Sequence, residues 1–106
     1  DQAGRRTAAM APLQQALRLN PDYTEALFLL ASWCDEAGNT AAAQEHYARV
    51  IATAPKPQAA LAANNLGCLL DRLGRQAEAE ACFRRAIALR PRHCQSWLNL
   101  GGCLIN

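Results

Sequence analysis

The stretch DEAGNTAAA, residues 35–43, occurs three times along the chain in recognisable form. Residues 1–9 read DQAGRRTAA, a shift of 34 positions, and residues 71–79 read DRLGRQAEA, a further shift of 36. Each copy has an aspartate three positions before a glycine, and an alanine five positions after that glycine. An internal period of this length indicates a protein built by stacking one small structural unit.

The prolines follow the same spacing. Pro21, Pro55 and Pro91 are 34 and then 36 residues apart and close each unit, because proline lacks an N–H group and clashes with the preceding helical turn. The two additional residues fall within KPQA, residues 56–59, since the sequence from Ala60 onward is back in phase. We expect them to lengthen the helix that begins near Pro57, so that it protrudes by about half a turn, or 3 Å.

Each unit has the pattern of two helices. Residues 24–37 and 41–53 both place apolar side chains at intervals of three and four, which defines one face of a helix. The turns are expected near Gly38, Pro55, Gly74 and Pro91, and no segment alternates like a strand.

Two local features bear on the helix ends. Asp22, three residues before Glu25, predicts a capping box at the start of a helix. Pro12 falls inside the opening helix and is expected to kink or fray it.

The repeat resembles the tetratricopeptide repeat, a helix-turn-helix unit of 34 residues. The unit from Ala60 to His93 departs from that family's pattern with Ala63 in the tryptophan position and Leu70 in the tyrosine position. Its matches to the family's signature positions are Leu66, Gly67, Gly74, Ala79, Phe83, Ala86 and Pro91.

The resemblance implies an all-α fold, a right-handed superhelical solenoid of antiparallel helix pairs with six helices. One domain would cover residues 1–106, with complete repeats at 24–59 and 60–93. Residues 1–23 would be the second helix of a truncated repeat, and residues 94–106 the first helix of another. The absence of an initial Met indicates a piece of a longer protein.

In this family the first helices line a concave groove, which implies a set of exposed groove residues. The predicted partner-binding residues are Phe28, Leu29, Ser32, Asp35, Leu61, Asn64, Asn65, Cys68, Asp71, Arg72, Gln95, Leu98 and Asn99, and Glu25, Glu36 and Gly102 occupy further groove positions.

Asn65 and Asn99 occupy equivalent positions within two Asn-Leu-Gly triplets. A column of amides can hold a peptide backbone, because each amide both donates and accepts hydrogen bonds. The triplets are similar to those of O-linked N-acetylglucosamine transferases, although Leu29 takes this place in the first complete unit. Solvation of the groove by these amides is an equally good interpretation. The family's two-carboxylate clamp is not expected, since Gln95 and Asn99 stand where it needs Lys and Arg.

The resemblance therefore predicts a protein–protein interaction scaffold that holds a peptide or helix of a partner. One alternative is the targeting or substrate-recruiting arm of a larger enzyme such as a glycosyltransferase, and another is a structural spacer. We do not expect an enzyme or a cofactor site. His93 and Cys94 are adjacent, and adjacent residues at a helix start point in different directions, which disfavours a nucleophile–base pair.

Composition excludes several other classes. The net charge is only +2, without the interleaved basic and aromatic residues of a nucleic-acid groove, and no apolar run is long enough for a membrane span. The five cysteines form no C-x-x-C pair and no zinc pattern, which favours free thiols, no metal, and a reducing, cytoplasmic compartment. We expect Cys34 to be buried and Cys68 to be the most accessible thiol.

Apolar residues also mark both ends of the array. We expect them to lie on faces that lack a covering helix, which favours end-to-end self-association. These residues are Ala9, Leu13, Ala16 and Leu17 near the start and Trp97, Leu100, Gly101 and Leu104 near the end.

Overall fold

The computed structural model describes residues 2–105, and the side chains of residues 2–7 and 9 lie outside that description. Within this part of the chain every regular element is a helix, which confirms the predicted all-α fold. The six helices are α1 (Gln2–Leu19), α2 (Thr24–Glu36), α3 (Thr40–Thr53), α4 (Lys56–Arg72), α5 (Gln76–Leu89) and α6 (Cys94–Ile105).

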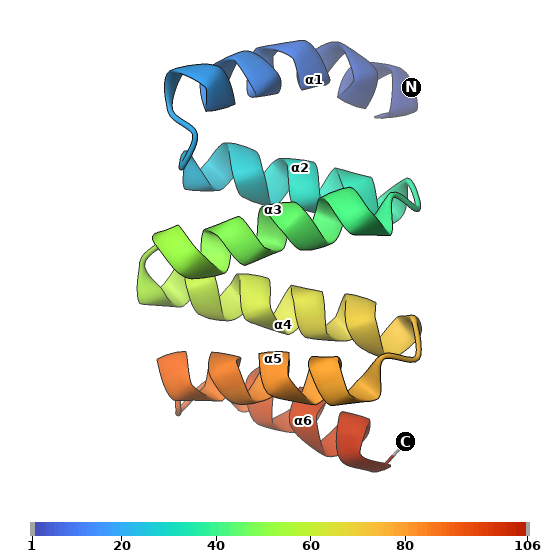
Figure 1. Cartoon of the computed structure of the whole chain (residues 1–106), viewed down its shortest axis with the longest axis vertical. Coiled ribbons are helices and arrows are strands. Elements are labelled where there is room, and N and C mark those ends of the chain that lie inside the picture. Colours follow the sequence, from blue (N-terminus) through green and yellow to red (C-terminus); the bar gives the residue numbers. More distant parts are fainter. Residues whose placement is uncertain (1, 106) are drawn as a thin grey trace.

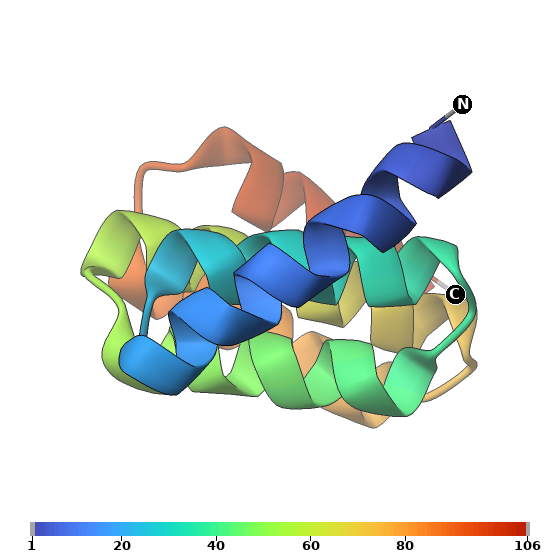
Figure 2. The same cartoon turned by 90° about the horizontal axis from the view of Figure 1, so that it is seen from above.

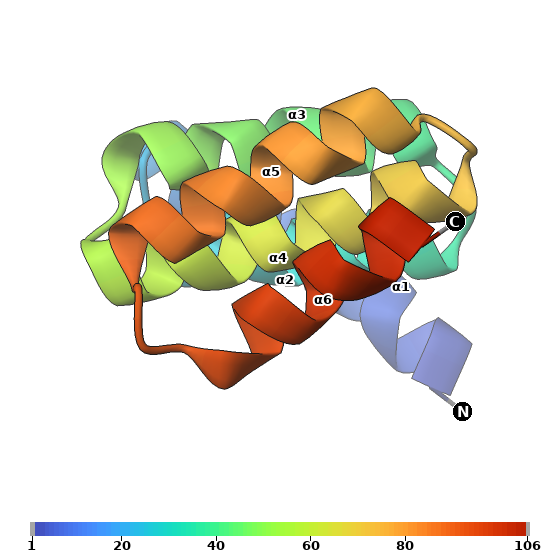
Figure 3. The ribbon, with the colours of Figure 1, turned by 90° about the horizontal axis from the view of Figure 1, so that it is seen from below.

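The helices stack in chain order along the long axis of the molecule, from α1 at one end to α6 at the other (Figure 1). Consecutive helices run in opposite directions, so that α2, α4 and α6 all point the same way (Figure 1). Seen along the stack, α3 and α5 overlap in one layer, and α2 and α4 overlap in the other (Figures 2 and 3). The first helices of successive units therefore share one side of the molecule.

The turns inside the two helix pairs have the same geometry. Gly38 and Gly74 have φ values of +84° and +80°, which glycine adopts without the penalty that a Cβ atom brings. The amide of Asn39 then donates to the carbonyl of Cys34 at 2.8 Å, and the amide of Arg75 does the same to Leu70 at 2.9 Å. These are the hydrogen bonds of a Schellman motif, which satisfies carbonyl groups at the end of a helix.

Helix α4 is longer at its start than the sequence predicted. It has 17 residues where α2 has 13, and it begins four positions before Ala60, the residue in register with the start of α2. The two inserted residues and two more from the connection have joined the helix, since only residues 54 and 55 separate α3 from α4. The extension is thus about 6 Å rather than the expected 3 Å. Gln58 and Ala59 are helical and do not form a looped bulge.

The core runs between the two layers. Its largest members include Tyr47 of α3 and Phe83 of α5, which occupy equivalent positions and are each 2% exposed. The ring of Phe28 meets that of Tyr47 edge to face with centroids 5.7 Å apart. A Cβ atom built on Gly67 would lie 2.5 Å from the Phe83 ring, so α4 approaches α5 closely there because residue 67 has no side chain.

One local prediction was wrong, and another was wrong in part. Asp22 does not cap α2: the capping position is Tyr23, without a side-chain hydrogen bond, and the Asp22 carboxylate accepts instead from Arg49 Nε at 3.1 Å. The long-range ion pair with α3 has replaced the local cap. The helix α1 continues through Pro12 to Leu19, so the expected fraying does not occur, and the expected kink stays a prediction.

Candidate functional site

One line of accessible side chains runs along each first helix. On α4 the exposed or half-exposed positions 61, 65, 68 and 72 recur at helical intervals of three and four, and on α2 the positions in register are 25, 29, 32 and 36. On α6 the corresponding residues are Gln95, Asn99 and Gly102. The predicted groove residues Leu29, Ser32, Leu61, Asn65, Cys68, Arg72, Gln95 and Asn99 all belong to these lines.

Three other predicted residues, Phe28, Asn64 and Leu98, occupy one equivalent position of the repeat, beside these lines. Asn64 was expected to be exposed, but it is buried, and its Nδ2 donates to Ser96 Oγ of α6 at 2.9 Å. Its Oδ1 has no partner among the described residues. Leu98 is 68% exposed because no described helix follows α6. Asn64 therefore joins α4 to α6 and does not line the accessible groove.

A hollow of about 270 Å³ lies between α2, α3 and α4, near the C-terminal ends of α2 and α4. Its walls combine residues from the accessible lines with Asp35 of α2 and the core residue Tyr47, and every one of them carries a polar group. They are Ser32, Asp35, Glu36, Tyr47, Asn65, Cys68 and Arg72. The hollow therefore offers several hydrogen-bonding groups within the reach of a single incoming side chain.

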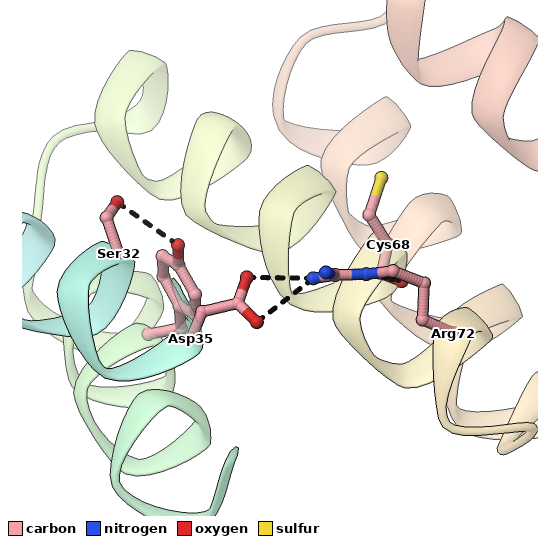
Figure 4. Close-up of polar contacts among 5 residues, drawn as sticks. Ser32, Asp35, Cys68 and Arg72 are labelled. Atoms are coloured by element: carbon pink, nitrogen blue, oxygen red, sulfur yellow. Dashed lines mark hydrogen bonds and ion pairs between the residues drawn. The ribbon is translucent and has the colours of Figure 1, made fainter. Parts of the chain in front are cut away.

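An ion pair joins the two walls of this hollow. Arg72 Nη2 donates to both carboxylate oxygens of Asp35, at 3.0 and 2.8 Å (Figure 4). The Asp35 side chain is 19% exposed and that of Arg72 is 63% exposed. A pair this exposed stabilises the fold by less than about 1 kcal/mol. It fixes instead the position of a carboxylate and a guanidinium at the surface.

Tyr47 forms part of the hollow although its ring belongs to the core. Its hydroxyl lies 3.3 Å from Ser32 Oγ. Burial, with the nearby Asp35 carboxylate, raises the pKa of the Tyr47 phenol above its usual value, against the smaller opposing effects of hydrogen bonds from Ser32 and Asn65 and of Arg72. The phenol thus stays neutral at physiological pH and both donates and accepts. The sequence identified Tyr47 only as a core residue, since its repeat position is an apolar one.

The Asn65 and Asn99 amides differ in their surroundings. Asn65 lines the hollow, whereas Asn99 Oδ1 accepts a hydrogen bond from Gln95 Nε2 at 2.9 Å, one turn away on α6. Leu29, in register with both, is 44% exposed. The three positions thus present one amide at the hollow, one amide engaged with its own helix, and one apolar side chain.

The thiols are free but unequal. Cys68 and Cys94 are exposed, Cys34 is only half-buried rather than buried as expected, and Cys103 is the buried one. Partial burial, with Asp71 and Asp35 nearby, raises the pKa of the Cys68 thiol, and Arg72 opposes this. The thiolate, which is the reactive form, is therefore disfavoured at Cys68.

The remaining catalytic and metal candidates have other partners. His93 Nδ1 lies 3.0 Å from Ser96 Oγ, within the buried polar contact that includes Asn64. Among residues 2–105 no three His, Cys, Asp or Glu side chains gather as metal ligands would. In the same stretch no helix combines the length and apolarity that crossing a membrane requires.

Antiparallel helix pairs stacked in register, with one accessible face on the first helices, define a helical-repeat protein of the kind that presents an extended surface. Comparison with family models identifies which kind. A tetratricopeptide repeat model matches residues 2–66, and a second tetratricopeptide repeat model matches residues 60–93. The chain belongs to the tetratricopeptide repeat family. No curated protein sequence matches it.

Proposed function

We propose that this chain holds a segment of a partner protein against the accessible face of α2, α4 and α6. Repeats of this family mediate protein–protein interactions, and the observation that supports this face is the polar hollow between α2 and α4. The hollow combines Asn65, Ser32 and the neutral hydroxyl of Tyr47, all of which both donate and accept hydrogen bonds. Such groups can pair with a peptide backbone or a polar side chain. We propose no catalytic role for the chain.

A substrate-recruiting arm of a larger enzyme would use the same face. The Asn-Leu-Gly triplets are the feature that suggested it. Since Asn99 is engaged with Gln95 and the first unit has Leu29 at this position, the amide column is discontinuous. The structure therefore gives this alternative less support than it gives a general binding module.

Self-association through the ends is a second, separate proposal. Trp97, Leu98 and Leu104 of α6 are more than half exposed. Leu100, which we had placed on the same open face, is instead buried. At the other end of the array, Leu13 and Leu17 of α1 are half-buried, and Leu17 packs against the core. The α1 end is therefore less open than expected. The side chain of Ala9 lies outside the description. The α6 face is thus the stronger candidate for such a contact.

The groove proposal is tested by comparing two amide-to-alanine variants as bait in a lysate of the native cells. Asn65→Ala removes an amide from the hollow, and Gln44→Ala removes an equally half-exposed amide from the outer helix α3. We expect Asn65→Ala to retain a specific partner less strongly, by roughly 0.5–1.5 kcal/mol for each hydrogen bond lost, at unchanged helicity. The proposal is wrong if Gln44→Ala loses the partner and Asn65→Ala keeps it.

A further inference from the structure

The charged groups that line the hollow between α2, α3 and α4 already have partners. Asp35 and Arg72 pair with each other, and Glu36 has an interaction of its own. Asp71 of α4 is not among the residues that line the hollow. A charged side chain of a partner would therefore have to displace an existing contact, and it would lose part of its own hydration on entering.

The uncharged groups of the hollow have hydrogen-bonding capacity to spare. Tyr47 Oη lies 3.3 Å from Ser32 Oγ, so one of these hydroxyls donates to the other. A hydroxyl has one donor and two acceptor sites, and the hydroxyl that accepts keeps its own hydrogen for another partner. Asn65 also bonds to the Tyr47 hydroxyl and adds an amide, which both donates and accepts. The uncharged part of the wall thus presents donors and acceptors side by side.

The second complete unit does not repeat this arrangement. A shift of 36 positions places Cys68 where Ser32 stands and Phe83 where Tyr47 stands. Phe83 has no hydroxyl, and its ring packs against Gly67 of α4. Of the two complete units, only the first has the hydroxyl pair, so this pair can hold a partner segment in one register along the array.

A carboxamide side chain complements such a wall best. It brings one carbonyl acceptor and two N–H donors, whereas an ammonium or guanidinium group only donates and a carboxylate only accepts. An apolar side chain would leave the polar groups that it covers without partners, which costs free energy once water is excluded.

An exposed leucine lies on the same line of accessible residues. Leu61 of α4 is 47% exposed and precedes Asn65 by four residues, about 6 Å along the helix. In an extended peptide this distance spans two residues, and side chains two positions apart point to the same side. A partner segment that lies along α4 can therefore place an apolar side chain against Leu61 and a polar one in the hollow.

From this arrangement we infer that the hollow selects a carboxamide side chain, glutamine or asparagine, of an extended partner segment, and that the Tyr47 hydroxyl determines this specificity. An apolar residue two positions away in the segment would lie against Leu61. This inference rests on the proposed binding function and names the chemistry of the partner.

The test is an NMR titration of the ¹⁵N-labelled protein with four synthetic peptides of alanine and glycine. Each carries a leucine with the same test residue two positions before it and two positions after it: glutamine, glutamate, lysine or methionine. Glutamate and methionine are close to glutamine in size, so they separate hydrogen bonding from shape. We expect the glutamine peptide to shift the amide resonances of α2 and α4 and to bind roughly two- to tenfold more tightly than each of the others, the effect of one additional hydrogen bond.

Variants that lose a single hydroxyl identify the determinant. Tyr47→Phe, which copies the residue of the second unit, should remove most of the preference for glutamine. Ser32→Ala removes the other hydroxyl from a half-buried position outside the core and should have the same effect. Tyr23→Phe should preserve the preference, because Tyr23 is 43% exposed and precedes α2, at the opposite end of that helix from the hollow.

Equal binding of all four peptides to α2 and α4 would show that the face binds the peptide backbone instead. That result, or tighter binding of any other peptide than the glutamine one, would overturn the inference and leave the groove function standing. So would a preference for glutamine that survives in both Tyr47→Phe and Ser32→Ala. Peptides that shift neither α2 nor α4 would also overturn the inference, and the groove function would fail with it if the shifts fell on α3 and α5 instead.

Discussion

Gly67 and Phe83 determine how closely the second complete helix pair packs. The ring of Phe83 is buried and lies where a side chain at residue 67 would begin. The position in register on α2 is Ala31, and the one on α6 is Gly101, around which no atom lies within 4 Å of an added Cβ. All three are small residues at one equivalent position of the repeat. Gly101 was expected on a face without a covering helix, and among the described residues nothing packs on that side of α6.

This difference gives a prediction for two identical substitutions. Gly67→Ala should lower the free energy of unfolding by about 1–3 kcal/mol, since the new methyl group collides with a ring that has no room to move. Gly101→Ala should raise it by as much as 1 kcal/mol or so, because alanine is the better helix former. Urea unfolding followed by helicity measures both.

A double variant separates the collision from other effects. If the Phe83 ring causes the loss, Gly67→Ala combined with Phe83→Leu should cost less than the sum of the two single substitutions. Additive costs, or a Gly67→Ala variant as stable as the parent, would show that α4 and α5 are not in close contact at this point.

At the scale of the elements, the sequence predicted the helices well because their ends depend on local chemistry. Gly38 and Gly74 adopt the positive φ values that end a helix, and Pro55 stands directly before α4. The errors came where a distant residue changed the local outcome. Asp22 is engaged by Arg49, 27 positions away, and Asn64 is buried by the arrival of α6. No pattern within one helix records such contacts.

At this scale we predict that the protein self-associates through the exposed face of α6. We expect the protein to associate in a concentration-dependent way, and Trp97→Glu with Leu104→Glu to reduce this, because the substitutions place charge on an apolar surface. Sedimentation velocity over a wide concentration range measures it. Leu73→Glu is the matched control, an exposed leucine in the turn between α4 and α5. A protein that stays monomeric at high concentration would contradict the proposal, as would equal loss of association in the control.

For the whole molecule, the family resemblance predicted which face is accessible but not what lies on it. The lines through Leu29 and Leu61 follow from helical periodicity and the register of the repeats. The hollow does not, because it needs the Tyr47 hydroxyl from α3 and an ion pair between Asp35 and Arg72, 37 positions apart. Tyr47 and its partner Ser32 lie on different helices, and so do Asp35 and Arg72. Only the packing of three helices brings these groups together.

The central claim is that a partner lies on the face of the first helices, and site-specific photo-cross-linking tests it most directly. A photoreactive side chain would replace Leu61 on that face in one variant and Ala88, exposed on the outer helix α5, in another. After irradiation in a lysate of the native cells, the account predicts a specific cross-linked protein from position 61 and none from position 88. A specific product from position 88, with none from position 61, would contradict it.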